Sequence, residues 1–115
     1  MDEELMAKQQ PQSLEAEQAV LGSILIDSRC VTEVIGILKP EDFYQEQNRE
    51  IYETVYTMFN FSETIDPVTI LDKLKELGYY HDNSREYVMQ LMEITPTAAN
   101  VVRYANIVQE KAMLR

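Results

Sequence analysis

The stretch SLEAEQAVLGSILID, residues 13–27, decides the fold class, because its apolar residues recur at the spacing of one helix face. Ser13 is a residue type that caps helix starts, so we expect a helix from there to about Asp27. Gly22 lies in its middle at a cost of up to about 1 kcal/mol, which indicates that another helix packs closely there. The residues expected to face inward are Leu14, Val20, Leu21, Ile24 and Leu25.

Further helices are predicted on the C-terminal side of this stretch. Ser28 is expected to cap a short helix that ends by Pro40, and Cys30 at the edge of its inward face is expected to be a small core residue. The segment PEDFY, residues 40–44, is expected to be a tight turn that places Phe43 in the core. The next helices are predicted over 47–59, over 67–77 with Asp66 as cap and Gly78 as stop, and from the cap Ser84 to about Met92. Their expected inward residues include Val34, Leu38, Ile51, Tyr52, Val55, Val68, Leu71, Leu74, Leu77, Val88 and Leu91.

The last predicted helix spans ITPTAANVVRYANIVQEKAMLR, residues 94–115. Thr95 or Thr97 can cap its start, and Pro96 suits a helix entrance. One apolar stripe is expected to close the core: Ala98, Val101, Val102, Ala105, Val108 and Ala112. Tyr104, Ile107 and Leu114 are expected on roughly the opposite side, which indicates a second contact. Because no segment alternates apolar and polar residues for long, we expect an all-α fold, a compact bundle of about six helices.

Composition restricts the class of protein. The chain has 115 residues, enough for one domain, with 45% apolar and 26% charged residues. A net charge of −10 disfavours tight nucleic-acid binding and docking on an anionic membrane. Cys30 is the only cysteine and no run of 18 apolar residues exists, so a cytoplasmic protein is expected. Residues 1–11 are predicted to be a flexible tail.

No catalytic motif is found. The three glycines, Gly22, Gly36 and Gly78, do not form the GxxxxGKS or GxxxxGKT loop that wraps nucleotide phosphates. Cys30 and His81 are too few for a zinc site, which takes three or four such ligands. A Cys30–His81 nucleophilic pair is the remaining enzyme hypothesis, and it requires a reactive thiol. We therefore expect a non-enzymatic chain without a cofactor or metal.

Tyrosines surround the loop after Gly78. Tyr79, Tyr80 and Tyr87 lie there with Arg85 among them. Three interpretations remain open from the residues alone: packing in the core, contact with a protein partner, and stacking on nucleic-acid bases. The last needs basic neighbours, and only Arg85 is near.

Four blocks carry a resemblance to a known family: PQSLEAEQAVLGSIL (11–25), PEDFY (40–44), IDPVTILDKL (65–74) and TPTAANVVRYANIVQEKAMLR (95–115). Together they resemble the N-terminal domain of the bacterial replicative DNA helicase, the DnaB family. The sequence departs from the family where many relatives have a Gly pair, at Asn83-Ser84, and where many have His-Gln, at Gln47-Asn48. These departures affect loop geometry and a helix start.

The resemblance implies a non-catalytic collar domain over residues 12–115. In this family a hexameric ring hydrolyses ATP and unwinds DNA, and the motor that binds ATP and Mg²⁺ lies in a C-terminal domain absent from this chain. The N-terminal domains recruit primase through its C-terminal domain, and the last helix here is the first arm of a helical hairpin that pairs subunits. An alternative is a stand-alone helical module that regulates a helicase ring. Candidate primase contacts are Tyr79, Tyr80, Arg85 and Tyr87. Candidate hairpin or oligomer contacts are Tyr104, Ile107, Lys111 and Leu114.

Overall fold

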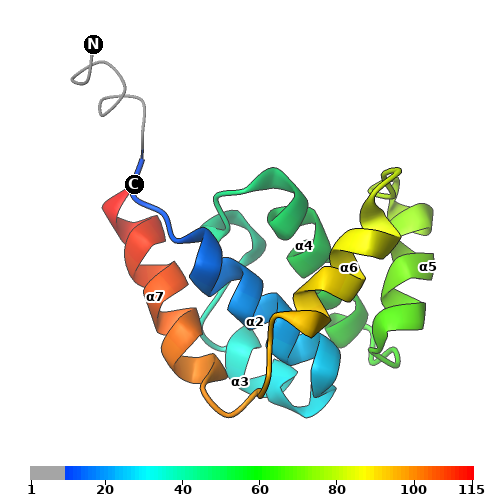
Figure 1. The fold of residues 1–115 in the computed structure, drawn as a ribbon, viewed down its shortest axis with the longest axis horizontal. Coiled ribbons are helices and arrows are strands. Elements are labelled where there is room, and N and C mark those ends of the chain that lie inside the picture. Colours follow the sequence, from blue (N-terminus) through cyan, green and yellow to red (C-terminus); the bar gives the residue numbers. More distant parts are fainter. Residues whose placement is uncertain (1–9) are drawn as a thin grey trace.

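Helix α2, Leu14–Ile26, runs through the middle of the fold, with α7 on one side and α4 and α6 on the other (Figure 1). The computed structural model describes residues 10–115, which form six α-helices, two 3-10 helices and no strand. The elements after α2 are η1 (Ser28–Cys30), α3 (Val31–Ile35), η2 (Pro40–Asp42), α4 (Glu46–Asn60), α5 (Pro67–Leu77), α6 (Ser84–Glu93) and α7 (Val101–Leu114). The expected all-α bundle is confirmed. Residues 1–9 of the expected tail lie outside the described residues.

Helix α2 is buried on most of its circumference because it is apolar on most of its circumference. Val20, Leu21 and Ile24 are almost fully inaccessible, and Gly22 and Ser23 between them are buried as well. A helix without a broad polar face belongs inside a fold, where several helices can cover it. The capping prediction is confirmed, since the Ser13 hydroxyl accepts a hydrogen bond from the Ala16 N–H at 3.2 Å.

Gly22 marks the closest approach between α2 and the end of α6. A Cβ atom built at Gly22 would lie 1.9 Å from the Thr95 Oγ1 and 2.5 Å from the Leu91 carbonyl oxygen. The Thr95 hydroxyl donates to that carbonyl at 2.8 Å, so both groups that face Gly22 are held in place at the end of α6. The expectation that Gly22 permits close helix packing is confirmed.

Local signals place several boundaries as expected. Phe43 is buried after η2, and Cys30 is buried in the core. The Asp66 carboxylate accepts from the Thr69 N–H at 2.8 Å to cap α5, and Gly78 ends that helix with a left-handed φ of 80°.

Three predicted helix starts are wrong. Ser28 is the first residue of η1 rather than its cap, because the Asp27 carboxylate accepts from the Arg29 N–H and takes that role. Helix α7 begins at Val101 rather than at Thr95 or Thr97, because the Thr95 hydroxyl bonds back to α6 and the Thr97 hydroxyl accepts from the Ala99 N–H within the connecting loop. Ser84 is the first residue of α6 rather than its cap, and its hydroxyl accepts from the His81 N–H at 2.8 Å.

Some residues expected to face inward are exposed. Val68 lies about 160° around the helix from Ile70, and it is Ile70, with Leu74, that α5 buries. On α7 the buried stripe is Val101, Ala105 and Val108, which leaves Val102 on the outside. The exposed fractions are 42% for Leu14, 76% for Val68, 36% for Leu77 and 37% for Val102. Among residues 10–115 no helix is both long and apolar enough to cross a membrane.

We predict that Gly22→Ala lowers the free energy of unfolding by about 1–3 kcal/mol, because the new methyl group must displace the backbone of α6. Gly36→Ala is the matched control, since the nearest atom to its Cβ would be 3.7 Å away, and it should be neutral or slightly stabilising. Urea denaturation of the two variants measures the difference, and equal stability would contradict the close α2–α6 contact.

Candidate functional site

A buried carboxylate joins α2 to the start of α4. Glu17 is only 1% exposed, and its side chain accepts three hydrogen bonds. The donors are the Tyr44 N–H at 2.7 Å, the Gln45 N–H at 3.3 Å and the Asn48 side-chain amide at 3.0 Å. Hydrogen bonds from fixed donors allow a charged group to be buried without a cation. Glu17 therefore holds the entrance of α4 against α2.

The same network reaches α6 through Asn48, which is fully buried. Its side-chain oxygen accepts a hydrogen bond from the Tyr87 hydroxyl, and Gln18 donates to that hydroxyl at 3.4 Å. Burial raises the pKa of Tyr87 above its usual value, so the phenol stays neutral and remains a donor. A continuous network of side-chain hydrogen bonds thus connects α2, α4 and α6.

Glu17 and Asn48 are functional residues that the sequence pattern did not identify. A signal existed for Glu17, because it lies three residues before Val20 and four before Leu21, which places it on the apolar face of α2. A charged residue on a buried face needs hydrogen-bond partners, so this position alone indicates a buried polar contact. Asn48 carried no such signal, since a polar residue in the first turn of a helix is ordinary.

The four candidate primase contacts lie on the α5–α6 loop and the first turn of α6, but they are not equally exposed. Tyr79 and Tyr87 are half-buried, and both hydroxyls are directed at α4, where Tyr79 donates to Glu53. That hydrogen bond is the main cause that raises the pKa of Tyr79. Tyr80 is 36% exposed with the Lys75 ammonium 4.9 Å from its ring centre, and Arg85 is exposed.

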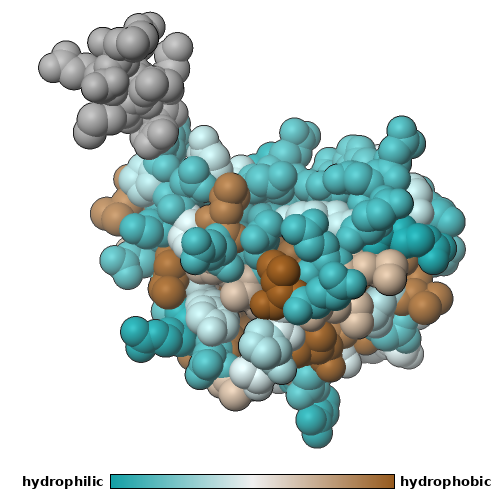
Figure 2. Space-filling model, in the orientation of Figure 1, coloured by the Kyte–Doolittle hydropathy of each residue, from teal (hydrophilic) through white to brown (hydrophobic). Residues whose placement is uncertain are grey.

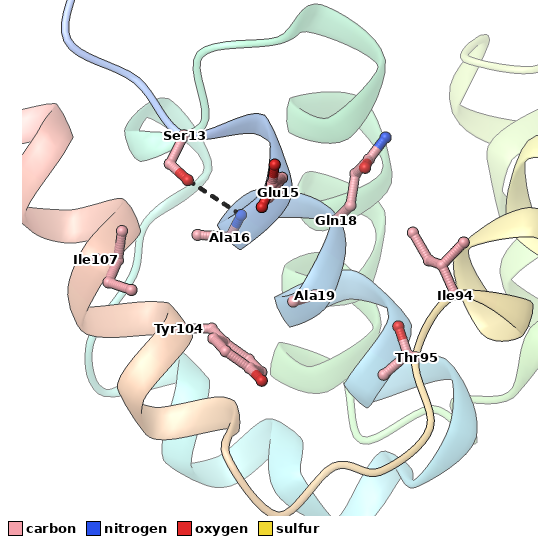
Figure 3. Close-up of a pocket in the computed structure, with 9 residues that line it drawn as sticks. All are labelled: Ser13, Glu15, Ala16, Gln18, Ala19, Ile94, Thr95, Tyr104 and Ile107. Atoms are coloured by element: carbon pink, nitrogen blue, oxygen red, sulfur yellow. Dashed lines mark hydrogen bonds between the residues drawn. The ribbon is translucent and has the colours of Figure 1, made fainter.

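A groove of about 370 Å³ lies between α2, α7 and the end of α6 (Figure 3). Tyr104 and Ile107 project into it from α7, Ala16 and Ala19 form the α2 side, and Ile94 lies at the opposite edge. Tyr104 and Ile107 pack against the core, so the expectation that they lie opposite the buried stripe is wrong. Tyr104 lies about 60° around the helix from Val101 and borders the stripe, while Ile107 lies about 120° away on the same side, which faces the groove.

The C-terminal part of α7 presents apolar side chains to solvent. Leu114 is 63% and Met113 80% exposed, while Lys111 is half-buried. Figure 2 shows hydrophobic residues scattered over the face that carries α7, α2 and α6, among a hydrophilic majority. Arg115 donates to the Pro11 and Asp42 carbonyl oxygens, both at 2.8 Å, and so connects the end of α7 to the segment before α2 and to η2.

The two reactive residue types are not brought into one site. Cys30 is a buried member of the core, and burial raises the pKa of its thiol to about 11, which disfavours the thiolate that catalysis requires. The His81 Nε2 lies 2.7 Å from a Glu50 carboxylate oxygen instead. Within the part of the chain that the structure describes, no three His, Cys, Asp or Glu side chains are placed to hold a metal ion.

Comparison with known proteins gives one consistent result. Residues 9–110 match the family model described as the DnaB-like helicase N terminal domain. The chain is 39% identical over 111 residues to the replicative DNA helicase DnaB of Geobacillus stearothermophilus, and 37% identical over 106 residues to that of Leifsonia xyli subsp. xyli. Each match covers 91% of this chain and 23% of the relative, so the chain spans less than a quarter of the relatives' length.

A solved structure agrees with the sequence comparison. The fold is similar to the crystal structure of the N-terminal domain of DnaB helicase from Mycobacterium tuberculosis, with a TM-score of 0.88 and 37% identity. The match covers 93% of this chain and 75% of that one.

We predict that Glu17→Gln lowers the free energy of unfolding by about 2–4 kcal/mol, because the new amide group points a donor at backbone N–H donors in a buried site. Glu15→Gln is the matched control on the exposed face of the same helix, and it should cost less than about 1 kcal/mol. Thermal and urea unfolding monitored by circular dichroism compare them. A Glu17→Gln protein as stable as the control would show that the carboxylate does not hold α4.

Proposed function

The chain belongs to the family of DnaB-like helicase N-terminal domains, and from this membership we propose that it recruits primase and pairs with other subunits in the collar of a replicative helicase ring. In this proposal the domain is non-catalytic and works in the cytoplasm. Its partners are the C-terminal domain of primase and further copies of the helicase.

The surface of the α5–α6 loop supports primase recruitment. Tyr80 offers a partly exposed aromatic ring, and the exposed Arg85 side chain forms no hydrogen bond or ion pair with any other residue between 10 and 115. Tyrosine and arginine are over-represented among residues that dominate protein–protein affinity. The exposure of Tyr80 and Arg85 near one loop, with no catalytic group assembled among residues 10–115, is the observation that carries the proposal. Tyr79 and Tyr87 contribute beside it from half-buried positions.

Subunit pairing is assigned to α7. Leu114 and Met113 expose apolar area that favours association when covered, and Tyr104, Ile107 and Lys111 lie along the neighbouring side of the helix. A continuation of the chain as the second arm of a hairpin, or another subunit, would cover these residues in the proposed assembly.

ATP binding and hydrolysis are assigned to a different part of the parent protein. The chain has no GxxxxGKS or GxxxxGKT sequence with which to hold the phosphates of ATP with Mg²⁺, and it corresponds to less than a quarter of its relatives. Its net charge of −10 opposes tight binding to DNA, so we do not include direct DNA binding by this domain in the proposal.

We predict that isothermal titration of this protein with the C-terminal domain of primase from the same source shows micromolar or tighter binding. The variant Tyr80→Ala/Arg85→Ala should weaken this affinity by at least about tenfold, because it removes both exposed anchors. The matched control is Phe61→Ala/Arg29→Ala, which removes an exposed aromatic ring and an exposed guanidinium from other parts of the surface and should bind as the unmodified protein does.

Absence of heat at several temperatures would contradict recruitment by this domain, since a single temperature can coincide with zero binding enthalpy. Equal affinity of the two double variants would leave recruitment intact but remove the α5–α6 surface as its location.

A further inference from the structure

Three side chains along one face of α4 contact three residues of the α5–α6 loop, and the loop runs in the opposite direction to the helix. Gln47 and Asn83 exchange two amide hydrogen bonds, at 3.1 and 3.3 Å. The Glu50 carboxylate lies 2.7 Å from the His81 ring nitrogen, and Glu53 accepts from the Tyr79 hydroxyl. We call these three contacts, 47–83, 50–81 and 53–79, the rungs.

The spacing of the rungs follows from helix geometry. Residues three apart on a helix lie on one face, so Gln47, Glu50 and Glu53 form a row along α4. The loop runs antiparallel to that row after Gly78 reverses the chain in its left-handed conformation. Figure 1 shows the α5–α6 connection at the end of the fold that carries α5 and α6, away from α7.

The rungs matter for the loop more than for the fold. A hydrogen bond at a protein surface contributes about 1 kcal/mol or less, so the domain should remain folded without them. The loop, however, buries little: Gly78, Tyr80, His81, Asp82 and Asn83 are all exposed. Segments with few buried apolar contacts open locally unless other contacts hold them. The rungs are therefore the contacts by which α4 holds the loop, and they act together with the His81–Ser84 hydrogen bond within the loop and the half-buried Tyr79 ring.

We propose that Gln47, Glu50 and Glu53 are positioning residues, which fix the α5–α6 loop so that Tyr80 and Arg85 are presented together to the protein partner. This inference rests on the proposed recruitment of primase. Tyr80 lies between the rungs at Tyr79 and His81, and Arg85 follows the rung at Asn83 by two residues. The matching partner surface has an apolar pocket for a phenol ring and a carboxylate for a guanidinium group.

The test breaks the rungs from the α4 side. The variant Gln47→Ala/Glu50→Ala/Glu53→Ala should increase amide hydrogen exchange of residues 79–83 by about tenfold or more while the melting temperature changes by only a few degrees. Its affinity for the primase C-terminal domain should fall about tenfold, because only a fraction of the molecules then holds the binding conformation. Glu33→Ala/Glu110→Ala removes two exposed carboxylates elsewhere, controls for the altered net charge, and should change neither quantity.

A second pair of variants keeps the test decisive if the triple variant unfolds. Tyr79→Phe removes one oxygen atom and Glu53→Ala removes its acceptor, so both break the same rung. Their losses of primase affinity should be similar and should not add in the double variant, since the second change finds the rung already broken.

The inference is overturned if exchange of residues 79–83 rises while primase affinity stays within twofold of the unmodified value, or if the losses of Tyr79→Phe and Glu53→Ala add fully. If the unmodified protein still binds the primase C-terminal domain in those cases, the proposed function is unaffected. Failure of the unmodified protein to bind primase overturns the proposed function and this inference with it.

Discussion

The burial of the Glu17 carboxylate is the constraint on which the arrangement of the helices depends. A charged oxygen pair removed from water must find donors, or it costs several kcal/mol. Here the donors are two backbone N–H groups at the entrance of α4 and the amide of Asn48, and no Lys or Arg between residues 10 and 115 forms an ion pair with it. Because those donors lie in the first turn of α4 and in the two residues before it, satisfying Glu17 fixes the start of α4 on α2. The free side of Asn48 then takes the Tyr87 hydroxyl and fixes the start of α6.

A second constraint acts at the other end of α6. Gly22 lets the Leu91 carbonyl and the Thr95 side chain lie directly on α2, closer than any residue with a Cβ atom would allow. Helix α6 is thus attached to α2 at both ends, by a polar network at Tyr87 and by backbone contact at Gly22. The α5–α6 loop directly precedes the Tyr87 contact at the start of α6. The contacts between α6 and α2 therefore set the position of the loop relative to the rest of the domain. In this way a buried helix determines the position of a surface loop.

Much of the fold could be predicted from periodicity and capping, because these signals are local. Ser13, Asp66 and Gly78 act in the structure as their residue types indicate, and the spacing of Val20, Leu21 and Ile24 identifies the buried helix. The start of α7 could not be predicted in this way. Thr95 is a residue type that often caps helices, but its hydroxyl donates a hydrogen bond to α6 instead.

The candidate site was predictable only in part, for a related reason. The sequence places Tyr79, Tyr80, Arg85 and Tyr87 near one loop, but it does not show which of them are directed inward. That depends on Asn48 and Glu53, which are more than 25 residues away along the chain. Likewise, Val68 was expected inside because it continues an apolar pattern, and only the position of α4 shows that α5 buries Ile70 instead. Long-range partners decide these questions, and a single sequence does not name them.

The most direct test of the central claim, that this domain meets primase through the surface held by α4, is a nuclear magnetic resonance titration of the isotope-labelled protein with the unlabelled primase C-terminal domain. The claim predicts that backbone amide shifts change chiefly within residues 79–90 and the facing residues of α4, while amides of α3 and of the η2 segment stay unchanged. Shift changes confined to another face, such as α7 alone, or no changes at all, would contradict it.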